Sequence, residues 1–226
     1  AFAWKVEERD DPIQAPFAAI LGCADARVPT EMVFGRGRNE LFVVRVAGNV
    51  LGQECLGSLR YAASHFSETL KLLVVLAHTK CGAVREAVDV YLDPCRYLEL
   101  SSDYSVRSIL DQIRVAVGLA AMTIEERYGP DIICELQCRS AWREVTAAPN
   151  AARNAHCLNQ EFRSRYPDVG VVFGVYDLLS RYVSLPLSPS NRLSDAEKGL
   201  FAPPDNAEDF VSLQVASVLA NLSRVC

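Results

Sequence analysis

The sequence lacks the features of several broad classes of protein. No apolar run approaches the roughly 20 residues that a membrane-spanning helix needs. The first residues, "AFAWKVEERDD", contain no basic segment followed by an apolar one, as a secretion signal would. Basic residues are not in excess, since 23 Lys and Arg stand against 28 Asp and Glu. We therefore expect no membrane partner, no nucleic-acid partner and a cytoplasmic location, or an organellar one if a transit segment has been removed.

Histidine is scarce in this chain, whereas cysteine is abundant. There are three histidines and eight cysteines, and no two cysteines form a Cys-x-x-Cys pair. The missing pair disfavours a redox protein. Without a secretion signal, metal ligands and reduced core cysteines are favoured over a disulfide framework, which is the alternative. The cysteines are Cys23, Cys55, Cys81, Cys95, Cys134, Cys138, Cys157 and Cys226.

The apolar pattern predicts a single α/β domain over residues 1–226, a length that suits one domain. Four continuous apolar runs are typical of buried parallel strands, at 17–22, 40–48, 71–78 and 169–177. Segments with helical spacing lie between and after them, at 52–68, 81–92, 105–128, 150–166 and 207–223. This alternation predicts a mostly parallel central sheet of four or five strands flanked by helices.

Polar residues with metal-binding chemistry follow two of the predicted strands. The first run is followed by Cys23, in "GCADARVPTE", and the third ends in "AHTKCGAV", with His78 and Cys81. Sites in parallel sheets form beyond the carboxyl ends of the strands. If these strands are neighbours, the three side chains converge. Cys81 also begins a predicted helix, where the helix N-terminus favours a thiolate.

Two thiolates and one imidazole form a three-ligand zinc set. Structural zinc sites usually have four protein ligands, whereas catalytic sites have three and an open position. No fourth ligand is equally well placed, because His65 and His156 lie inside predicted helices. Cys134 and Cys138 have no neighbouring histidine and are expected to pack in the core. The count therefore predicts a catalytic Zn²⁺ site.

Asp25 and Arg27 are candidate catalytic residues beside this site. In an extended chain, residues two apart point to the same side, so Asp25 lies on the side of Cys23. Arg27 can hold the carboxylate by a bidentate pair and keep it ionised. Asp25 would then either accept a proton from zinc-bound water or ligate the zinc. Alone, "ADARVPTE" favours a surface pair before a helix capped by Thr30, but the distant "HTKC" favours the metal site.

"CADARVP" together with "HTKCGAV" resembles the β-class carbonic anhydrases, whose pattern is Cys-x-Asp-Ser-Arg followed by His-x-x-Cys-Gly. The similarity extends to 41–49, 57–66 and 171–180, and the plant-type branch of the class is favoured. The resemblance implies the ligands Cys23, His78 and Cys81 and the catalytic pair Asp25 and Arg27. It further implies substrate-binding positions at Gln14, Phe42, Tyr61 and the backbone of Gly82. The family usually forms homodimers or higher homo-oligomers with the pocket at the interface.

Several positions depart from the family pattern without removing a ligand. Ala26 replaces the serine of the first motif, and Ala47 stands where the plant-type pocket has valine, which predicts a roomier pocket. Val46 stands where many members have asparagine, and Ala77 replaces the glycine often found before the histidine. Residues 93–150 match the family poorly, and the sequence suggests no role for them.

The implied activity is the reversible hydration of CO₂ to bicarbonate and a proton by a zinc-bound hydroxide. One alternative is a zinc hydrolase of carbonyl sulfide or carbon disulfide, which the altered pocket at Ala47 leaves open. Another is a non-catalytic zinc-binding interaction protein, which the intact pair of Asp25 and Arg27 disfavours.

Overall fold

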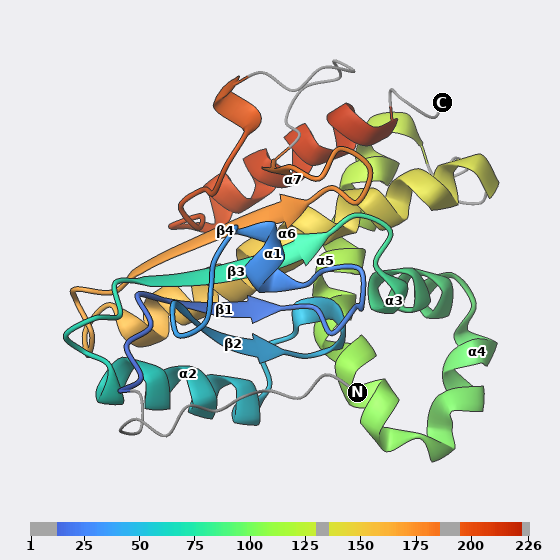
Figure 1. The fold of residues 1–226 in the computed structure, drawn as a ribbon. Helices are drawn as coiled ribbons and strands as arrows, with labels where there is room; N and C mark the ends of the chain where they lie inside the picture. Colours follow the sequence, from blue (N-terminus) through green and yellow to red (C-terminus); the bar gives the residue numbers. More distant parts are fainter. Residues whose placement is uncertain (1–12, 130–135, 186–194, 223–226) are drawn as a thin grey trace.

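The computed structural model describes residues 13–129, 136–185 and 195–222. Its centre is a five-stranded sheet in the order β2-β1-β3-β4-β5, shown in Figure 1. The first four strands are parallel and β5 pairs antiparallel with β4. The strands are β1 (Ala18–Gly22), β2 (Leu41–Arg45), β3 (Leu72–His78), β4 (Gly170–Tyr176) and β5 (Val183–Ser184). The predicted α/β architecture is confirmed, and each predicted strand run contains one observed strand.

Seven α-helices and three short 3₁₀-helices accompany the sheet in the described residues. The α-helices are α1 (Thr30–Val33), α2 (Gln53–His65), α3 (Gly82–Leu92), α4 (Pro94–Glu99), α5 (Tyr104–Tyr128), α6 (Leu136–Phe162) and α7 (Ala207–Leu222). The 3₁₀-helices are η1 (Ala47–Asn49), η2 (Leu100–Ser102) and η4 (Asp195–Glu197). None of the helices in the described residues has the length and apolar character to cross a bilayer.

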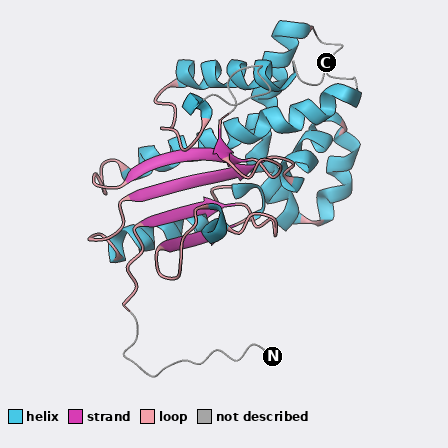
Figure 2. Cartoon of the chain, turned by 45° about the horizontal axis from the view of Figure 1, so that its top comes forward, coloured by secondary structure: helices cyan, strands magenta, loops and turns pink. Residues whose placement is uncertain are grey.

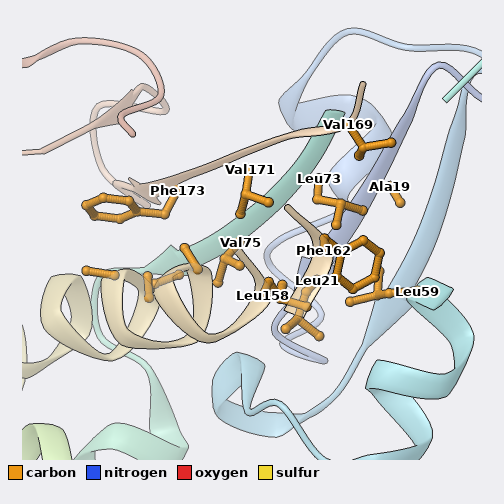
Figure 3. Close-up of a cluster of buried hydrophobic side chains, with 14 of the residues drawn as sticks. Ala19, Leu21, Leu59, Leu73, Val75, Leu158, Phe162, Val169, Val171 and Phe173 are labelled. Carbon is orange, nitrogen blue, oxygen red and sulfur yellow. The ribbon is translucent and has the colours of Figure 1, made fainter. Parts of the chain in front are cut away.

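The main core lies between one face of the sheet and the helices α2 and α6. Alternate residues of each strand point to this face, as the two-residue period of a strand requires. Figure 3 shows these side chains, such as Leu21, Val75 and Val171, meeting Leu158 and Phe162 of α6. The opposite face is covered by α1 and by the chain that follows β4, with Ile20, Val74 and Leu76 buried there.

Helices α3 and α5 lie beyond the carboxyl ends of the strands (Figures 1 and 2). A second core joins them to α6. Its buried side chains include Val84 and Val88 of α3, Ile113 of α5 and Trp142 of α6. Cys23 and Cys81 belong to the same cluster. The two cysteines that follow β1 and β3 are therefore buried against these helices, while Ala24, Lys80 and Gly82 beside them stay exposed.

The predicted start of the helix at 150–166 is wrong, because α6 begins at Leu136 and includes Pro149. A proline inside a helix removes one backbone hydrogen bond and leaves the carbonyl four residues earlier without its donor. Here that carbonyl belongs to Val145, and the hydroxyl of Ser217 in α7 donates to it at 3.4 Å. The tertiary contact thus compensates for the break that the sequence predicts.

Several short elements, such as α4 and β5, are absent from the sequence-based prediction, and α1 is present only in the alternative that places a helix at Thr30. Helices α1 and α4 and strand β5 have only 4, 6 and 2 residues, too few to show a periodic pattern. A single domain over residues 1–226 stays a prediction, since the first 12 and last 4 residues lie outside the described part.

Candidate metal centre

Cys23 is the first residue after β1, and hydrogen bonds to the end of β2 hold the backbone on either side of it. The amide of Val46 donates to Gly22 O at 3.1 Å, and the amide of Ala24 donates to Val46 O at 3.2 Å, so pairing continues past the strand ends. Arg45, the last residue of β2, also donates from Nε to the carbonyl of Cys23 at 3.0 Å. Sequence reasoning missed Arg45, although a charged residue ending the apolar run "LFVVR" was a possible signal.

His78 is the last residue of β3 and is fully buried. Its Nδ1 lies 2.9 Å from the carbonyl oxygen of Thr79, which can only accept, so Nδ1 carries the hydrogen. The other ring nitrogen, Nε2, is buried and has no hydrogen-bond partner. An imidazole held in this way presents the free electron pair of Nε2, as metal-bound histidines do.

Because β1 and β3 are neighbours, the structure brings Cys23, His78 and Cys81 together. Their ligand atoms all lie within 4.8 Å of one another, and the two sulfur atoms are 3.9 Å apart. Two sulfur ligands of a tetrahedral zinc, each at about 2.3 Å, are separated by about 3.8 Å. Within the described residues, this is the one group of three such side chains found. The donor set therefore fits a zinc ion in both chemistry and spacing.

Gly48 supports the sulfur of Cys23 from η1. Its amide donates to Sγ of Cys23 at 3.3 Å, and its backbone adopts a φ of 68°. A Cβ at this position would lie 2.7 Å from Cδ1 of Ile113. Asn150 of α6 donates from Nδ2 to the Gly48 carbonyl at 3.0 Å. The positive φ favours glycine here, and an added Cβ would also require Ile113 to shift.

The two cysteines share a proton unequally in the metal-free chain. A hydrogen bond from the thiol of Cys81 lowers the pKa of Cys23 to about 4, against the opposing effect of burial. The same hydrogen bond and its own burial raise the pKa of Cys81 well above the usual range. Burial lowers the pKa of His78, but Cys23, the Thr79 carbonyl and Asp25 together outweigh this effect, so that pKa is raised. Metal ligands must lose these protons, so metal binding would release them.

Asp25 lies beside the three ligands and is held by Arg27. Its Oδ1 accepts from the amide and from Nε of Arg27, both at 2.9 Å, and its Oδ2 accepts from Nη2 at 2.6 Å. These bonds hold the pKa of Asp25 well below its usual range. Oδ2 lies 3.8 Å from Nε2 of His78. The structure thus places an ionised carboxylate at the edge of the candidate metal site.

Thr30 does not have the capping role of the alternative interpretation. Helix α1 does begin at Thr30, but its N-cap is Pro29 and no side chain caps it. The Thr30 hydroxyl is buried and donates to Glu31. The pair of Asp25 and Arg27 is therefore not explained as the entry to a capped helix.

The substrate positions implied by the resemblance fall at two different places. Gly82 follows Cys81 directly as the first residue of α3. Gln14 is exposed before β1, where Asn39 bonds to the backbone on both sides of it. Phe42 pairs with Ala19, four residues or about 13 Å of strand before Cys23. Tyr61 stays with Phe42, its ring centroid 6.5 Å away. One chain therefore does not bring Gln14, Phe42 or Tyr61 to the metal ligands.

The two remaining histidines lie on helices, as predicted. His65, in α2, stacks on Tyr61 with ring centroids 3.8 Å apart, and His156, in α6, bonds through Nδ1 to the carbonyl of Pro204. Neither belongs to the metal-binding group. The predicted core packing of Cys134 and Cys138 falls outside the residues and side chains that the structure describes.

Comparisons with known proteins agree on one family. The family model described as "Carbonic anhydrase" matches residues 18–178. The chain is 36% identical to carbonic anhydrase 2 of Mycobacterium tuberculosis over 135 residues, which cover 57% of this chain and 62% of that protein. It is 34% identical to the carbonic anhydrase of Mycolicibacterium smegmatis over 134 residues, covering 56% and 62%. The match thus spans less than two thirds of the length of these curated relatives.

Solved structures show the same fold at lower sequence identity. A tetrameric β-carbonic anhydrase from the ascomycete Sordaria macrospora matches with a TM-score of 0.52 and 20% identity, covering 75% of this chain and 80% of that one. The β-carbonic anhydrase CcaA matches with a TM-score of 0.53 and 18% identity, covering 76% and 73%. These likenesses show the β-class fold.

Proposed function

The chain belongs to the carbonic anhydrase family, with the β-class fold, and on that premise we propose that it catalyses the reversible hydration of CO₂ to bicarbonate and a proton. The observation that carries the proposal is the group of Cys23, His78 and Cys81, three donors within 4.8 Å of one another beside an ionised carboxylate. Three protein ligands leave one position of a tetrahedral zinc for a reactant.

Cys23, His78 and Cys81 would hold the zinc ion. Nε2 of His78 supports this assignment because it is a buried ring nitrogen with no partner in the described structure, and leaving such a group unpaired is unfavourable. When bound, the zinc supplies a Lewis acid that lowers the pKa of a water molecule towards neutrality. The amide of Gly48 and the two carbonyl contacts of Arg45 keep Cys23 in place.

Asp25 orients the attacking water rather than storing its proton. Its carboxylate accepts three hydrogen bonds from Arg27, which keep it ionised. Both oxygens therefore act as acceptors, and an accepting oxygen near Nε2 of His78 directs a water O–H away from the reacting carbon. The Asp25 carboxylate would in this way align the attacking oxygen with the carbon of CO₂.

We propose that a second copy of the chain completes the substrate pocket. Gln14, Phe42 and Tyr61 lie at the other end of the strands from Cys23, so they reach a metal centre only if it belongs to a partner. Tyr61 is 51% exposed, which leaves it free for such a contact. The Sordaria macrospora relatives with this fold are tetrameric. This arrangement therefore favours a homodimer or larger homo-oligomer over a monomer. That the pocket is of the plant type stays a prediction.

Stopped-flow CO₂ hydration of the zinc-loaded protein, run with metal analysis, tests the proposal. We expect turnover with one zinc per chain, and a loss of about 100-fold or more in Asp25→Asn with zinc retained, comparable to removal of a key oriented polar group. Asp168→Asn, at an exposed turn near the start of β4, is the matched control and should keep wild-type activity.

Two outcomes would contradict the proposal in different ways. Zinc binding without CO₂ hydration would favour the zinc-binding interaction protein. A parallel assay on carbonyl sulfide and carbon disulfide addresses the other alternative, which Ala47, in η1, leaves open. Hydrolysis of either compound without CO₂ hydration would assign the site to that reaction.

A further inference from the structure

The turn that joins His78 to Cys81 is held from several directions. On the β4 side, the amide of Thr79 donates to the carbonyl of Tyr176 at 3.0 Å. The hydroxyl of Thr79 accepts from the amide of Leu178 at 3.1 Å. Lys80, the next residue, has a φ of 57°, in the left-handed region that lysine rarely adopts. An additional interaction must therefore keep the chain in this conformation.

The peptide groups of Lys80 have partners on both sides. Its amide lies 3.1 Å and 3.3 Å from the two carboxylate oxygens of Glu144, which accept the hydrogen bond. Its carbonyl accepts from Nη2 of Arg27 at 3.2 Å. A continuous series of hydrogen bonds thus runs from Glu144 through Lys80 to Arg27 and on to Asp25.

Glu144 reaches the turn from a distant part of the chain. It lies in α6, 64 residues after Lys80, within the region 93–150 to which the sequence suggests no role. The carboxylate is only partly accessible, and burial raises the pKa of Glu144. Burying a carboxylate is unfavourable unless it is hydrogen-bonded, so the contact with Lys80 matters to both partners.

Side-chain packing does not support the turn on this side. A cavity of about 250 Å³ lies there, lined by Lys80, Cys81, Arg85, Arg143 and Glu144. No aliphatic or aromatic side chain lines this space, so the hydrogen bond of Glu144 is the contact that holds the Lys80 amide on this side. Cys81 follows Lys80 directly and would move with it.

We propose that Glu144 is a positioning residue of the metal centre. By accepting from the Lys80 amide, its carboxylate sets the position of Cys81 relative to His78. Through the Lys80 carbonyl, it also keeps Arg27 against Asp25. The proposal rests on the metal site of the proposed function, but not on CO₂ as the substrate.

The rate at which zinc passes to a chelator in excess measures this role without using catalysis. We expect Glu144→Ala to release zinc about tenfold faster than wild type or more, in the range seen when supporting partners of metal ligands are removed. Glu144→Gln should stay within about twofold, because its amide oxygen still accepts from Lys80. The absorption spectrum of the Co²⁺-substituted protein should change in the alanine variant and not in the glutamine variant.

Glu161 provides a matched control on the same helix. It also lies in α6 and bonds to a distant residue, Arg60. Glu161→Ala and Glu161→Gln should release zinc at the wild-type rate, even if they lower the stability of the fold. Faster release in Glu161→Ala equal to that in Glu144→Ala would overturn the proposal, since the effect would then follow from loss of any bond of α6.

Further results separate the proposal from its rivals. It is wrong if Glu144→Ala releases zinc like wild type, or if Glu144→Gln releases it as fast as the alanine variant. If Glu144→Ala does not fold, Glu144→Asp replaces it, since its shorter side chain keeps the charge but pulls back from Lys80. Equal zinc release from Glu144→Asp and Glu144→Gln would then overturn the proposal.

The two proposals fail in different ways. A wild type that binds no zinc overturns both of them, whereas bound zinc without CO₂ hydration overturns only the proposed function.

Discussion

The two ends of the central sheet carry different parts of the candidate site. At the carboxyl end, Cys23, His78 and Cys81 are buried and fully arranged within one chain. At the other end, Gln14 is exposed and Tyr61 is half exposed beside Phe42. A metal-binding group can therefore be complete in one chain while the surface proposed to recognise substrate is not.

The largest effect is expected from breaking the carboxyl end. Cys81→Ser removes a thiolate from a three-ligand set, so zinc content should fall from one per chain to near zero, with affinity reduced by more than about 100-fold. Cys95→Ser, at an exposed cysteine in α4, is the control and should keep its zinc. Elemental analysis after gel filtration measures both. Full zinc content in Cys81→Ser would remove Cys81 from the ligand set.

A change at the other end should lower activity without lowering zinc content. Tyr61→Ala is expected to reduce kcat/KM for CO₂ by about tenfold, equivalent to about 1.4 kcal/mol of transition-state binding. The reason is that the ring would be lost from a partner's pocket while Cys23 and Cys81 are untouched. Steady-state kinetics with metal analysis measures the split.

Mixed oligomers sharpen this comparison further. Subunits carrying Asp25→Asn and subunits carrying Tyr61→Ala, unfolded and refolded together, should recover activity above that of either variant alone. In a mixed dimer, one of the two sites would combine an intact Asp25 with an intact Tyr61 of the partner subunit. No recovery, despite mixed dimers shown by mass spectrometry, would place Tyr61 with its own chain's metal.

Backbone strain should affect a glycine beside the metal site differently from a glycine inside a helix. Gly48→Ala at the carboxyl end is expected to lower the free energy of unfolding by at least 1–2 kcal/mol, roughly the cost of a left-handed conformation for an L-residue, because its φ is 68° and a Cβ would contact Ile113. Gly57→Ala in α2 meets nothing within 4 Å and should be neutral or slightly stabilising. Urea denaturation of the metal-free proteins compares them. Equal stability of the two variants would mean that Gly48 is not constrained.

The smallest effect concerns the pH dependence of Asp25 in the metal-free chain. Its pKa is lower in the folded state than the unfolded value of 3.8, so the ionised carboxylate stabilises the fold above about pH 4, and this contribution is lost as the pH falls through the folded pKa. The stability difference between wild type and Asp25→Asn should therefore be present at pH 7 and shrink below pH 4. It is small because the Arg27 side chain is 55% exposed. Denaturation at several pH values tests it, and a difference that grows in acid would contradict it.

Much of the fold could be predicted from local patterns. The four parallel strands are continuous apolar runs because both faces of the sheet are covered, and such runs are visible without any tertiary information. The start of α6 could not be predicted, since Pro149 indicates a helix boundary and the compensating hydroxyl of Ser217 comes from α7, 68 residues later. Short elements such as α1 and β5 have too few residues to show a period.

The chemistry of the candidate site follows from local sequence. Cys23, His78 and Cys81 follow or end buried strands, and parallel strands end at the same edge, so their convergence needed only that β1 and β3 be neighbours. The contacts that hold these side chains in place, in contrast, depend on the tertiary fold. Arg45 on the Cys23 carbonyl and Glu144 on the Lys80 amide are contacts between residues 22 and 64 positions apart. Such contacts depend on how α6 and β2 pack, and packing leaves no periodic signal at a single position.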